Sequence, residues 1–141
     1  MIRKLHDDDI DIIADIWLDT NIKTHYFISP QYWKDNFNAV KEMLSQSEIY
    51  IYEKDNTLQG FIGLIDEYIA GIFVSSEVQS CGIGKLLMSF VKGIKKQLSL
   101  SVYQKNTRAV KFYQRENFKI KSVNVDENTG EKEYMMIWKL K

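Results

Sequence analysis

The segment from Gln79 to Leu86 carries the most informative chemistry in this chain of 141 residues. Gly82 and Gly84 lie between an apolar run typical of a strand and another typical of a helix. A glycine has no Cβ, so its backbone can adopt positive φ and approach a ligand closely, and the first N–H groups of a helix have no carbonyl partner within it. Because such N–H groups attract anions, the segment predicts a phosphate-binding loop; an ordinary tight turn before a helix is the alternative.

Two other phosphate-binding motifs are excluded by the residues themselves. The P-loop of nucleoside triphosphatases requires glycine at the position of Gln79 and serine or threonine at that of Leu86. The dinucleotide-binding fingerprint requires a small residue at the position of Leu87. The loop therefore belongs to neither class.

The elements that position this loop begin with a short strand over residues 1–5 and two helices. Asp7 to Asp9 offer N-cap oxygens for a first amphipathic helix, whose apolar residues are Ile10, Ile13, Ile16 and Trp17. Ser29 followed by Pro30 is typical of the start of a second helix. Both helices precede the first strands of the main sheet.

Strands and helices alternate in the second half of the chain. The expected strands are 49–52, 61–65, 68–74, 98–103, 118–125 and 134–140, with helices over 83–94 and 106–116. This order of strand, two helices, three strands, helix, strand, helix and two strands predicts an α/β protein with a mixed sheet and helices on both faces. Ligands bind such sheets where neighbouring strands diverge at their carboxyl ends, so the loops after Val74 and Tyr103 are expected to frame one crevice.

Length and composition limit the classes of function. The chain fits one domain over residues 1–141. Lysine plus arginine and aspartate plus glutamate number 19 each, which excludes a broad basic surface for nucleic acid or an anionic membrane. One cysteine, no apolar start typical of a secretory signal and no apolar run near the roughly 20 residues of a membrane span indicate the cytoplasm. An exposed final strand could pair two chains, so both monomer and homodimer remain open.

A second motif follows the glycine loop after one strand and one helix. It reads Asn106-x-x-Ala109-x-x-Phe112-Tyr113 and is followed by Asn117-Phe118. Together with the glycine loop it resembles the GCN5-related N-acetyltransferases (GNAT), and within them the small bacterial YiaC and YjaB type. That family usually has glycine at the position of Asn117, and asparagine also adopts the left-handed conformation at modest cost.

The resemblance implies acetyl-CoA as the acetyl donor and no metal. The pyrophosphate is expected on the backbone N–H groups of Gln79, Ser80, Cys81, Gly82, Ile83, Gly84 and Lys85. The pantetheine arm is expected along Ile72, Phe73 and Val74, whose backbone would pair with its amides as an added strand does. Asn106 is expected to contact the CoA arm, to cap the following helix, or to do both.

Tyr113 is the general acid that the resemblance implies. Acetyl transfer from a thioester needs a proton for the leaving thiolate. A phenol has a reference pKa of about 10, against about 8.5 for a thiol, so donation is uphill by only about 2 kcal/mol. Packing of Tyr113 beside Phe112 in the core is the alternative role. A main-chain N–H near Val74 would polarise the carbonyl, and direct transfer is expected because no base is positioned beside Cys81 for a covalent route.

The acceptor is expected where the first two helices meet the strands. The aromatic residues that could line its slot are His25, Tyr26, Phe27, Tyr32 and Tyr68, although core packing explains the same pattern. A lysine ε-amine costs about 4 to 5 kcal/mol to neutralise at pH 7, so a general base would be valuable. The candidates for this base are His25, Asp66, Glu67 and Glu77, and none is assigned. The three carboxylates would also favour a cationic acceptor.

Three functions compete at this point. The leading prediction is acetyl transfer from acetyl-CoA to a primary amine, with a protein lysine favoured by the resemblance and a small-molecule amine as the close alternative. A non-catalytic module that senses acetyl-CoA would keep the glycine loop, although Tyr113 argues against it. An RNA-directed acetyltransferase needs a basic face, for which Lys92, Lys95 and Lys96 are too few.

Overall fold

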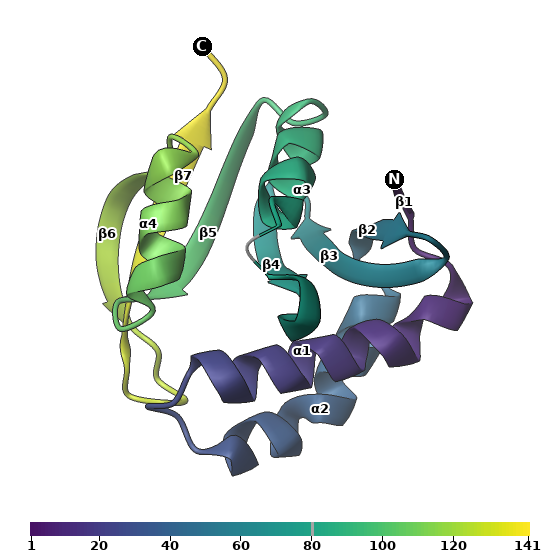
Figure 1. Cartoon of the computed structure of the whole chain (residues 1–141). Helices are drawn as coiled ribbons and strands as arrows, with labels where there is room; N and C mark the ends of the chain where they lie inside the picture. Colours follow the sequence, from purple (N-terminus) through teal and green to yellow (C-terminus); the bar gives the residue numbers. More distant parts are fainter. Residues whose placement is uncertain (80) are drawn as a thin grey trace.

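A computed structural model describes residues 1–79 and 81–141 and places seven strands in one sheet (Figure 1). The predicted element order and mixed α/β class are confirmed. The elements are β1 (Ile2–Lys4), a 3-10 turn (Asp7–Asp9), α1 (Ile10–Thr24), α2 (Pro30–Ser45), β2 (Glu48–Lys54), β3 (Thr57–Ile65), β4 (Tyr68–Val74), a second 3-10 turn (Ser76–Val78), α3 (Ile83–Lys92), β5 (Gln97–Tyr103), α4 (Thr107–Arg115), β6 (Lys119–Val125) and β7 (Lys132–Lys139).

The strand order across the sheet is β1-β2-β3-β4-β5-β7-β6. β4 and β5 are parallel neighbours, and the other pairs are antiparallel. The expectation that the final strand is exposed is wrong, because β7 lies between β5 and β6 and leaves β6 at the edge. The reason is burial: Met136 and Trp138 of β7 reach the core, whereas every residue of β6 is exposed.

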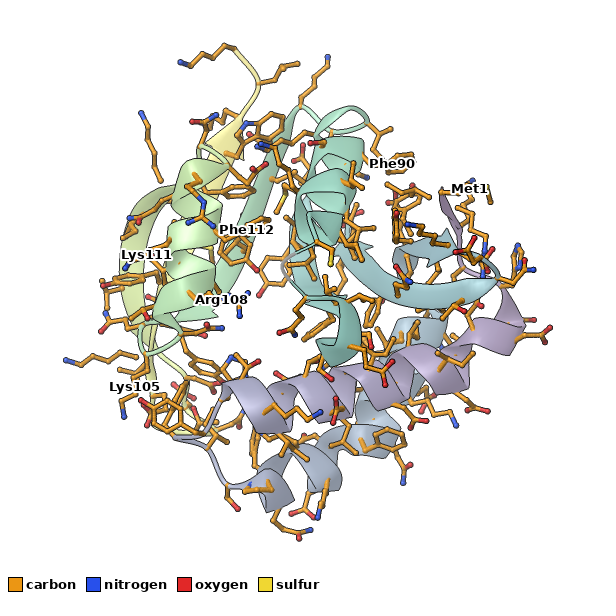
Figure 2. All side chains as sticks on the ribbon, viewed as in Figure 1. Met1, Phe90, Lys105, Arg108, Lys111 and Phe112 are labelled. Carbon is orange, nitrogen blue, oxygen red and sulfur yellow. The ribbon has the colours of Figure 1, made fainter. Side chains whose placement is uncertain are left out.

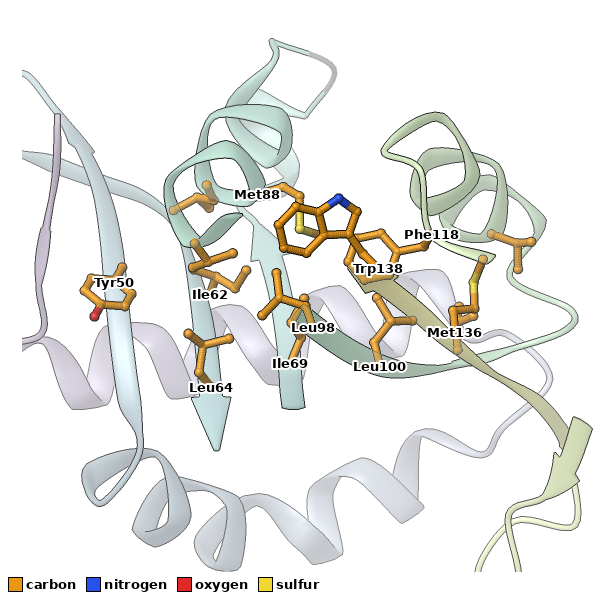
Figure 3. Packing of buried hydrophobic residues seen from close by; sticks show 14 of the residues in the cluster. Tyr50, Ile62, Leu64, Ile69, Met88, Leu98, Leu100, Phe118, Met136 and Trp138 are labelled. Carbon is orange, nitrogen blue, oxygen red and sulfur yellow. The ribbon is translucent and has the colours of Figure 1, made fainter. Parts of the chain in front are cut away.

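Helices cover the sheet from both sides. On one side α1 and α2 pack over β2 and β3, through residues such as Ile13, Trp33 and Phe61. On the other side α3 and α4 pack over the sheet through Leu87, Val91, Val110, Leu100 and Met136, part of the cluster in Figure 3. Among the described residues, the α1–α2 cluster draws nothing from β6 or β7.

Local conformations follow the expected turn and cap residues, with one exception. Ser29 caps α2 by accepting a hydrogen bond from the Gln31 N–H at 3.2 Å. Asn117 adopts the left-handed conformation, with φ of 69°, as its side chain permits. Asp9 does not cap α1, because its carboxylate turns back to accept hydrogen bonds from the His6 N–H and from Arg3, each at 2.8 Å.

No helix within residues 1–79 and 81–141 combines the length and apolar character that crossing a membrane would require. All four α-helices instead contribute side chains to the two cores that flank the sheet.

Candidate acetyl-transfer site

The site begins where β4 and β5 separate. These strands pair only through Tyr68 with Ser99 and Ile69 with Leu100, and then diverge toward α1 (Figure 1). Beyond these pairs the carboxyl-terminal halves of the two strands are not paired with each other, and we call this separation the cleft. The glycine loop follows β4 and Asn106 follows β5, and Gln79 and Asn106 line one cavity.

The backbone of β4 offers hydrogen-bonding groups to this cleft. Ser75 donates from its N–H to the Gln59 carbonyl at 2.8 Å, and Phe73 is paired with Phe61 two residues earlier. Since backbone groups alternate in direction along an antiparallel strand, those of Ile72 and Val74 point away from β3 into the cleft. The Val74 carbonyl there accepts a hydrogen bond from the Gln79 side chain at 3.2 Å. Of the three residues expected along the pantetheine arm, Phe73 is thus the one whose backbone faces β3.

The glycine loop has the geometry of an anion cradle. Gly82 is the N-cap of α3 with φ of 83°, and a Cβ built there would meet nothing within 4 Å. The first helical bond runs from the Leu86 N–H to the Gly82 carbonyl, so the N–H groups of residues 83–85 have no carbonyl partner within the helix. These donors and the open space before Gly82 fit a phosphate.

The other residues of the glycine loop differ in burial and in what they contact. Ile83 is buried and can offer only its backbone, while Cys81 and Lys85 are exposed. A Cβ on Gly84 would lie 3.6 Å from the Phe112 ring, so this glycine lies at the contact between α3 and α4. Ser80 lies outside the described residues.

Three cations line a cavity of about 340 Å³ at the open end of the cleft. They are Lys23 on α1 and Lys105 and Arg108 around the start of α4, and none of the described lining residues is acidic. Figure 2 shows Arg108 and Phe112 on the side of α4 that faces α3, with Lys111 on the other side. The sequence motifs did not single out these cations, because Lys23 is brought to the cavity by the packing of α1. The basic residues Lys105 and Arg108 on either side of Asn106 are a local signal of positive charge in the sequence.

Asn106 links this cavity to α1 through a chain of hydrogen bonds. Its side-chain oxygen accepts from the Ala109 N–H at 3.3 Å, which confirms the helix cap. Its amide nitrogen lies 3.3 Å from His25 Nε2, and His25 Nδ1 lies 2.9 Å from the Asn21 side-chain oxygen. Because the amide nitrogen of Asn21 donates to the Trp17 carbonyl, its oxygen faces His25, so Nδ1 carries the proton and Nε2 accepts from Asn106.

His25 is neutral in this network. Its ring stacks on Trp33 and meets the edge of Tyr103, at centroid distances of 5.4 and 5.2 Å. This burial lowers the pKa of His25 to about 4. With both nitrogens engaged, His25 has no free atom to act as a base.

Protonation of His25 should therefore destabilise the fold. The unfolded state takes up a proton near pH 6.5 and the folded state only near pH 4, so stability falls as the pH decreases between these values, by about 3 kcal/mol. Urea unfolding at pH 7 and pH 4.5 should show a smaller pH dependence for His25→Gln than for the parent chain. The control is His6→Gln, because His6 is exposed and lies outside the network; an undiminished dependence in His25→Gln would contradict the assignment.

The other aromatic residues predicted for the acceptor separate into two places. Phe27 packs edge-on against Tyr103 at 5.7 Å and beneath the Lys105 ammonium, and Tyr26 is 80% exposed. Tyr68 lies instead at the closed end of the cleft, in a second cavity that also contains Asp66 and Glu67. The structure therefore does not bring the predicted slot residues together in one pocket.

Tyr113 lies on α4 and packs against the core that α3 and α4 form with the sheet. Its ring lies between Phe112 and Phe118, at centroid distances of 5.4 and 5.9 Å. Burial raises the pKa of Tyr113, and the nearby Tyr68 hydroxyl raises it further. The phenol thus keeps its proton at neutral pH, as a donor must.

Comparison with known proteins identifies the class. A family model for the acetyltransferase (GNAT) domain matches residues 45–120. The chain belongs to this family of GCN5-related N-acetyltransferases, which makes it an acetyl-CoA-dependent N-acetyltransferase, as the two motifs predicted.

Two individual relatives are similar to most of this chain. The chain is 32% identical over 140 residues to the peptidyl-lysine N-acetyltransferase YiaC of Escherichia coli K12, covering 98% of this chain and 96% of that protein. It is 27% identical over 120 residues to the peptidyl-lysine N-acetyltransferase YjaB of the same strain, covering 84% and 80%.

Solved structures show the same fold. Apo YjaB from Escherichia coli superposes with a TM-score of 0.87 at 22% identity, covering 98% of this chain and 96% of the other. The PaiA N-acetyltransferase of Thermoplasma acidophilum, solved with coenzyme A, has a TM-score of 0.82 at 23% identity and covers 99% and 98%.

Proposed function

We propose that residues 1–141 form one catalytic domain that transfers acetyl directly from acetyl-CoA to the ε-amine of a protein lysine. The observation that carries this proposal is the separation of β4 from β5, because it leaves the glycine loop and Asn106 at the carboxyl ends of two neighbouring strands, where Gln79 and Asn106 line one cavity. The names of the YiaC and YjaB relatives support the lysine acceptor.

Donor binding would rest mainly on the backbone. The N–H groups of the glycine loop, from Gln79 through Ser80, Cys81, Gly82, Ile83 and Gly84 to Lys85, would hold the pyrophosphate. Lys23, Lys105 and Arg108 line a cavity with Gln79 and would add positive charge. Lys23 also pairs with Asp19 at 3.1 Å and Lys105 with Glu131 at 2.9 Å, which reduces their contribution. The backbone of Ile72 and Val74 would pair with the pantetheine amides. Acetyl-CoA supplies the activated acetyl group and the leaving thiolate.

Tyr113 would give the departing sulfur its proton. The raised pKa makes complete donation less favourable than the reference phenol value suggests, so proton movement would accompany the breaking of the carbon–sulfur bond. A main-chain N–H of β4 near Val74 would polarise the carbonyl. Cys81 is exposed, and among the residues that the structure describes its thiol approaches only the Gln79 carbonyl, which supports transfer without an acetyl-enzyme.

Two ion pairs argue against the RNA-directed alternative. Lys92 approaches the Glu116 carboxylate at 3.4 Å and Lys95 that of Glu48 at 3.0 Å. Two of the three lysines considered for a basic face are therefore locally neutralised, which weakens their attraction for phosphate.

The test is acetyl-CoA-dependent release of thiol by the purified chain. Lysine peptides, peptides with a free α-amine, polyamines and aminoglycosides would be compared, with samples lacking an acceptor as controls. The proposal expects release with lysine peptides. Release with a small amine alone would establish the small-molecule alternative, and acetyl-CoA binding without release for any acceptor would favour the sensing module.

A further inference from the structure

Four hydrogen bonds in series join the last turn of α1 to the start of α4. The Ala109 N–H donates to Asn106 Oδ1 at 3.3 Å, and Asn106 Nδ2 donates to His25 Nε2 at 3.3 Å. His25 Nδ1 donates to Asn21 Oδ1 at 2.9 Å, and Asn21 Nδ2 donates to the Trp17 carbonyl at 2.8 Å. We propose that His25 is a positioning residue for the acetyl donor, which raises the affinity for acetyl-CoA by holding the Asn106 carboxamide in place. This inference rests on the proposed function and adds a residue that acts on the donor site through another.

The two ends of this series fix its direction. A backbone N–H can only donate and a carbonyl can only accept, so Ala109 and Trp17 set the orientation of the two asparagine amides. Between these amides the imidazole must carry its proton on Nδ1 and accept at Nε2. A ring with its proton on Nε2 would meet the amide nitrogen of Asn106 donor to donor. His25 therefore holds Asn106 in one tautomer only.

The series also joins the two sides of the cavity of about 340 Å³ at the open end of the cleft. On the α1 side the lining residues are Thr20, Lys23 and Thr24, and on the other side they are residues 105–108. Gln79 lines the cavity as well, and its side chain donates to the Val74 carbonyl at 3.2 Å. The cavity thus adjoins the end of β4 that carries the N–H proposed to polarise the acetyl carbonyl.

Asn106 keeps one hydrogen-bonding group for a ligand in this cavity. Its amide nitrogen carries two hydrogens, and His25 accepts one of them. Among the residues that the structure describes, the second hydrogen has no partner, and Asn106 lines the cavity. The amide carbonyls of the pantetheine arm and the oxygens of the pyrophosphate are acceptors of the kind that would bind it. An amide held in place before the ligand arrives has less freedom to lose on binding.

Aromatic rings restrict the orientation of the imidazole. The His25 ring stacks on Trp33 at a centroid distance of 5.4 Å and packs at a steep angle against Tyr103 and Phe27, at 5.2 and 5.6 Å. Tyr103 is the last residue of β5, and its carbonyl accepts a hydrogen bond from the Asn106 N–H at 3.0 Å. The same end of β5 thus anchors the backbone of Asn106 and packs against the ring that holds its side chain.

Nitrogen-15 NMR of the histidine rings tests the series in the unaltered protein at pH 7. The His25 proton should reside on Nδ1. Acetyl-CoA should shift the Nε2 resonance, because the amide that donates to it also lines the cavity. His6 is exposed and lies outside the cavity, so its resonances serve as the internal reference. A proton on His25 Nε2, or an unshifted Nε2 resonance when acetyl-CoA is bound, would overturn the proposal.

A double-mutant cycle, with acetyl-CoA affinity measured by calorimetry, tests whether His25 acts through Asn106. His25→Phe keeps an aromatic ring and removes both ring nitrogens, while Asn106→Ser keeps a cap oxygen and removes the amide. His25→Phe should raise the Kd about three- to tenfold in the parent chain and less than about twofold in the Asn106→Ser chain, because the group it acts through is then absent. Equal losses in both backgrounds would give His25 a purely structural role and overturn the proposal.

The matched control is Asn36→Ala. Asn36 lies on α2 outside the cavity, and its amide donates to the Tyr32 carbonyl at 2.7 Å, as the Asn21 amide does to its own helix. Its loss should leave the Kd unchanged, and a rise equal to that of His25→Phe would overturn the proposal. A weakened Asn106→Ser beside an unchanged His25→Phe would overturn this inference alone. Normal acetyl-CoA binding by Asn106→Ser would remove Asn106 from the proposed donor site and the inference with it.

Discussion

Tyr113→Phe should lower kcat for acetyl transfer more than about tenfold and leave the Kd for acetyl-CoA within about threefold. The substitution removes a single hydroxyl, so little surface is lost from a ring that packs between Phe112 and Phe118. The thiolate would then have to leave without a positioned proton, and a tenfold loss corresponds to about 1.4 kcal/mol of transition-state stabilisation. Steady-state thiol release and calorimetric binding measure the two quantities.

Tyr50→Phe is the matched control, because it also removes a hydroxyl from a tyrosine of the same core. The Tyr50 hydroxyl bonds to Glu48 and lies on β2, two strands away from the cleft. Its loss should leave kcat near the parent value. Unchanged turnover in Tyr113→Phe would refute the general-acid role and return Tyr113 to a purely structural one.

Gly82→Val should weaken acetyl-CoA binding by at least about a hundredfold. A valine Cβ would enter the open space before the helix start, which is the space proposed for the pyrophosphate. A branched side chain also resists the φ of 83° at this position, at a cost of roughly 1 to 2 kcal/mol. Calorimetric titration with acetyl-CoA measures the loss directly.

Gly130→Val is a control that separates the cost of backbone strain from the loss of space for the pyrophosphate. Gly130 has φ of 75° and, like Gly82, nothing within 4 Å of a built Cβ, but it lies in the turn between β6 and β7. Its substitution should destabilise the fold to a similar degree and leave acetyl-CoA affinity unchanged. If both variants bound acetyl-CoA normally, the glycine loop would not be the phosphate cradle.

The success of the local predictions has a physical basis. Ser29 and Asn106 cap their helices, and Asn117 takes a left-handed conformation, because short polar side chains satisfy or adapt to neighbouring backbone groups. The positive φ of Gly82 follows equally from the absent Cβ. These preferences act over three or four residues, so the amino-acid sequence expresses them directly.

The errors arose where the outcome depended on distant partners. Asp9, one of the three aspartates expected to offer cap oxygens to the first helix, instead accepts hydrogen bonds from Arg3 on β1. The pattern of the final strand predicts an exposed edge, but the burial of Met136 and Trp138 places β7 inside the sheet. In each case a nonlocal contact outweighed the local pattern.

By itself the sequence determined the order of the elements, the glycine loop, the helix that carries Tyr113 and, through the two motifs, the family. Only the tertiary structure decided which side chains of these elements lie together. It split the aromatic residues between the network around His25 and the cavity of Tyr68, and it brought Lys23 beside Arg108. Backbone preferences and helical spacing are local and can be read along the chain, whereas the neighbours of a side chain are set by how helices and strands pack together.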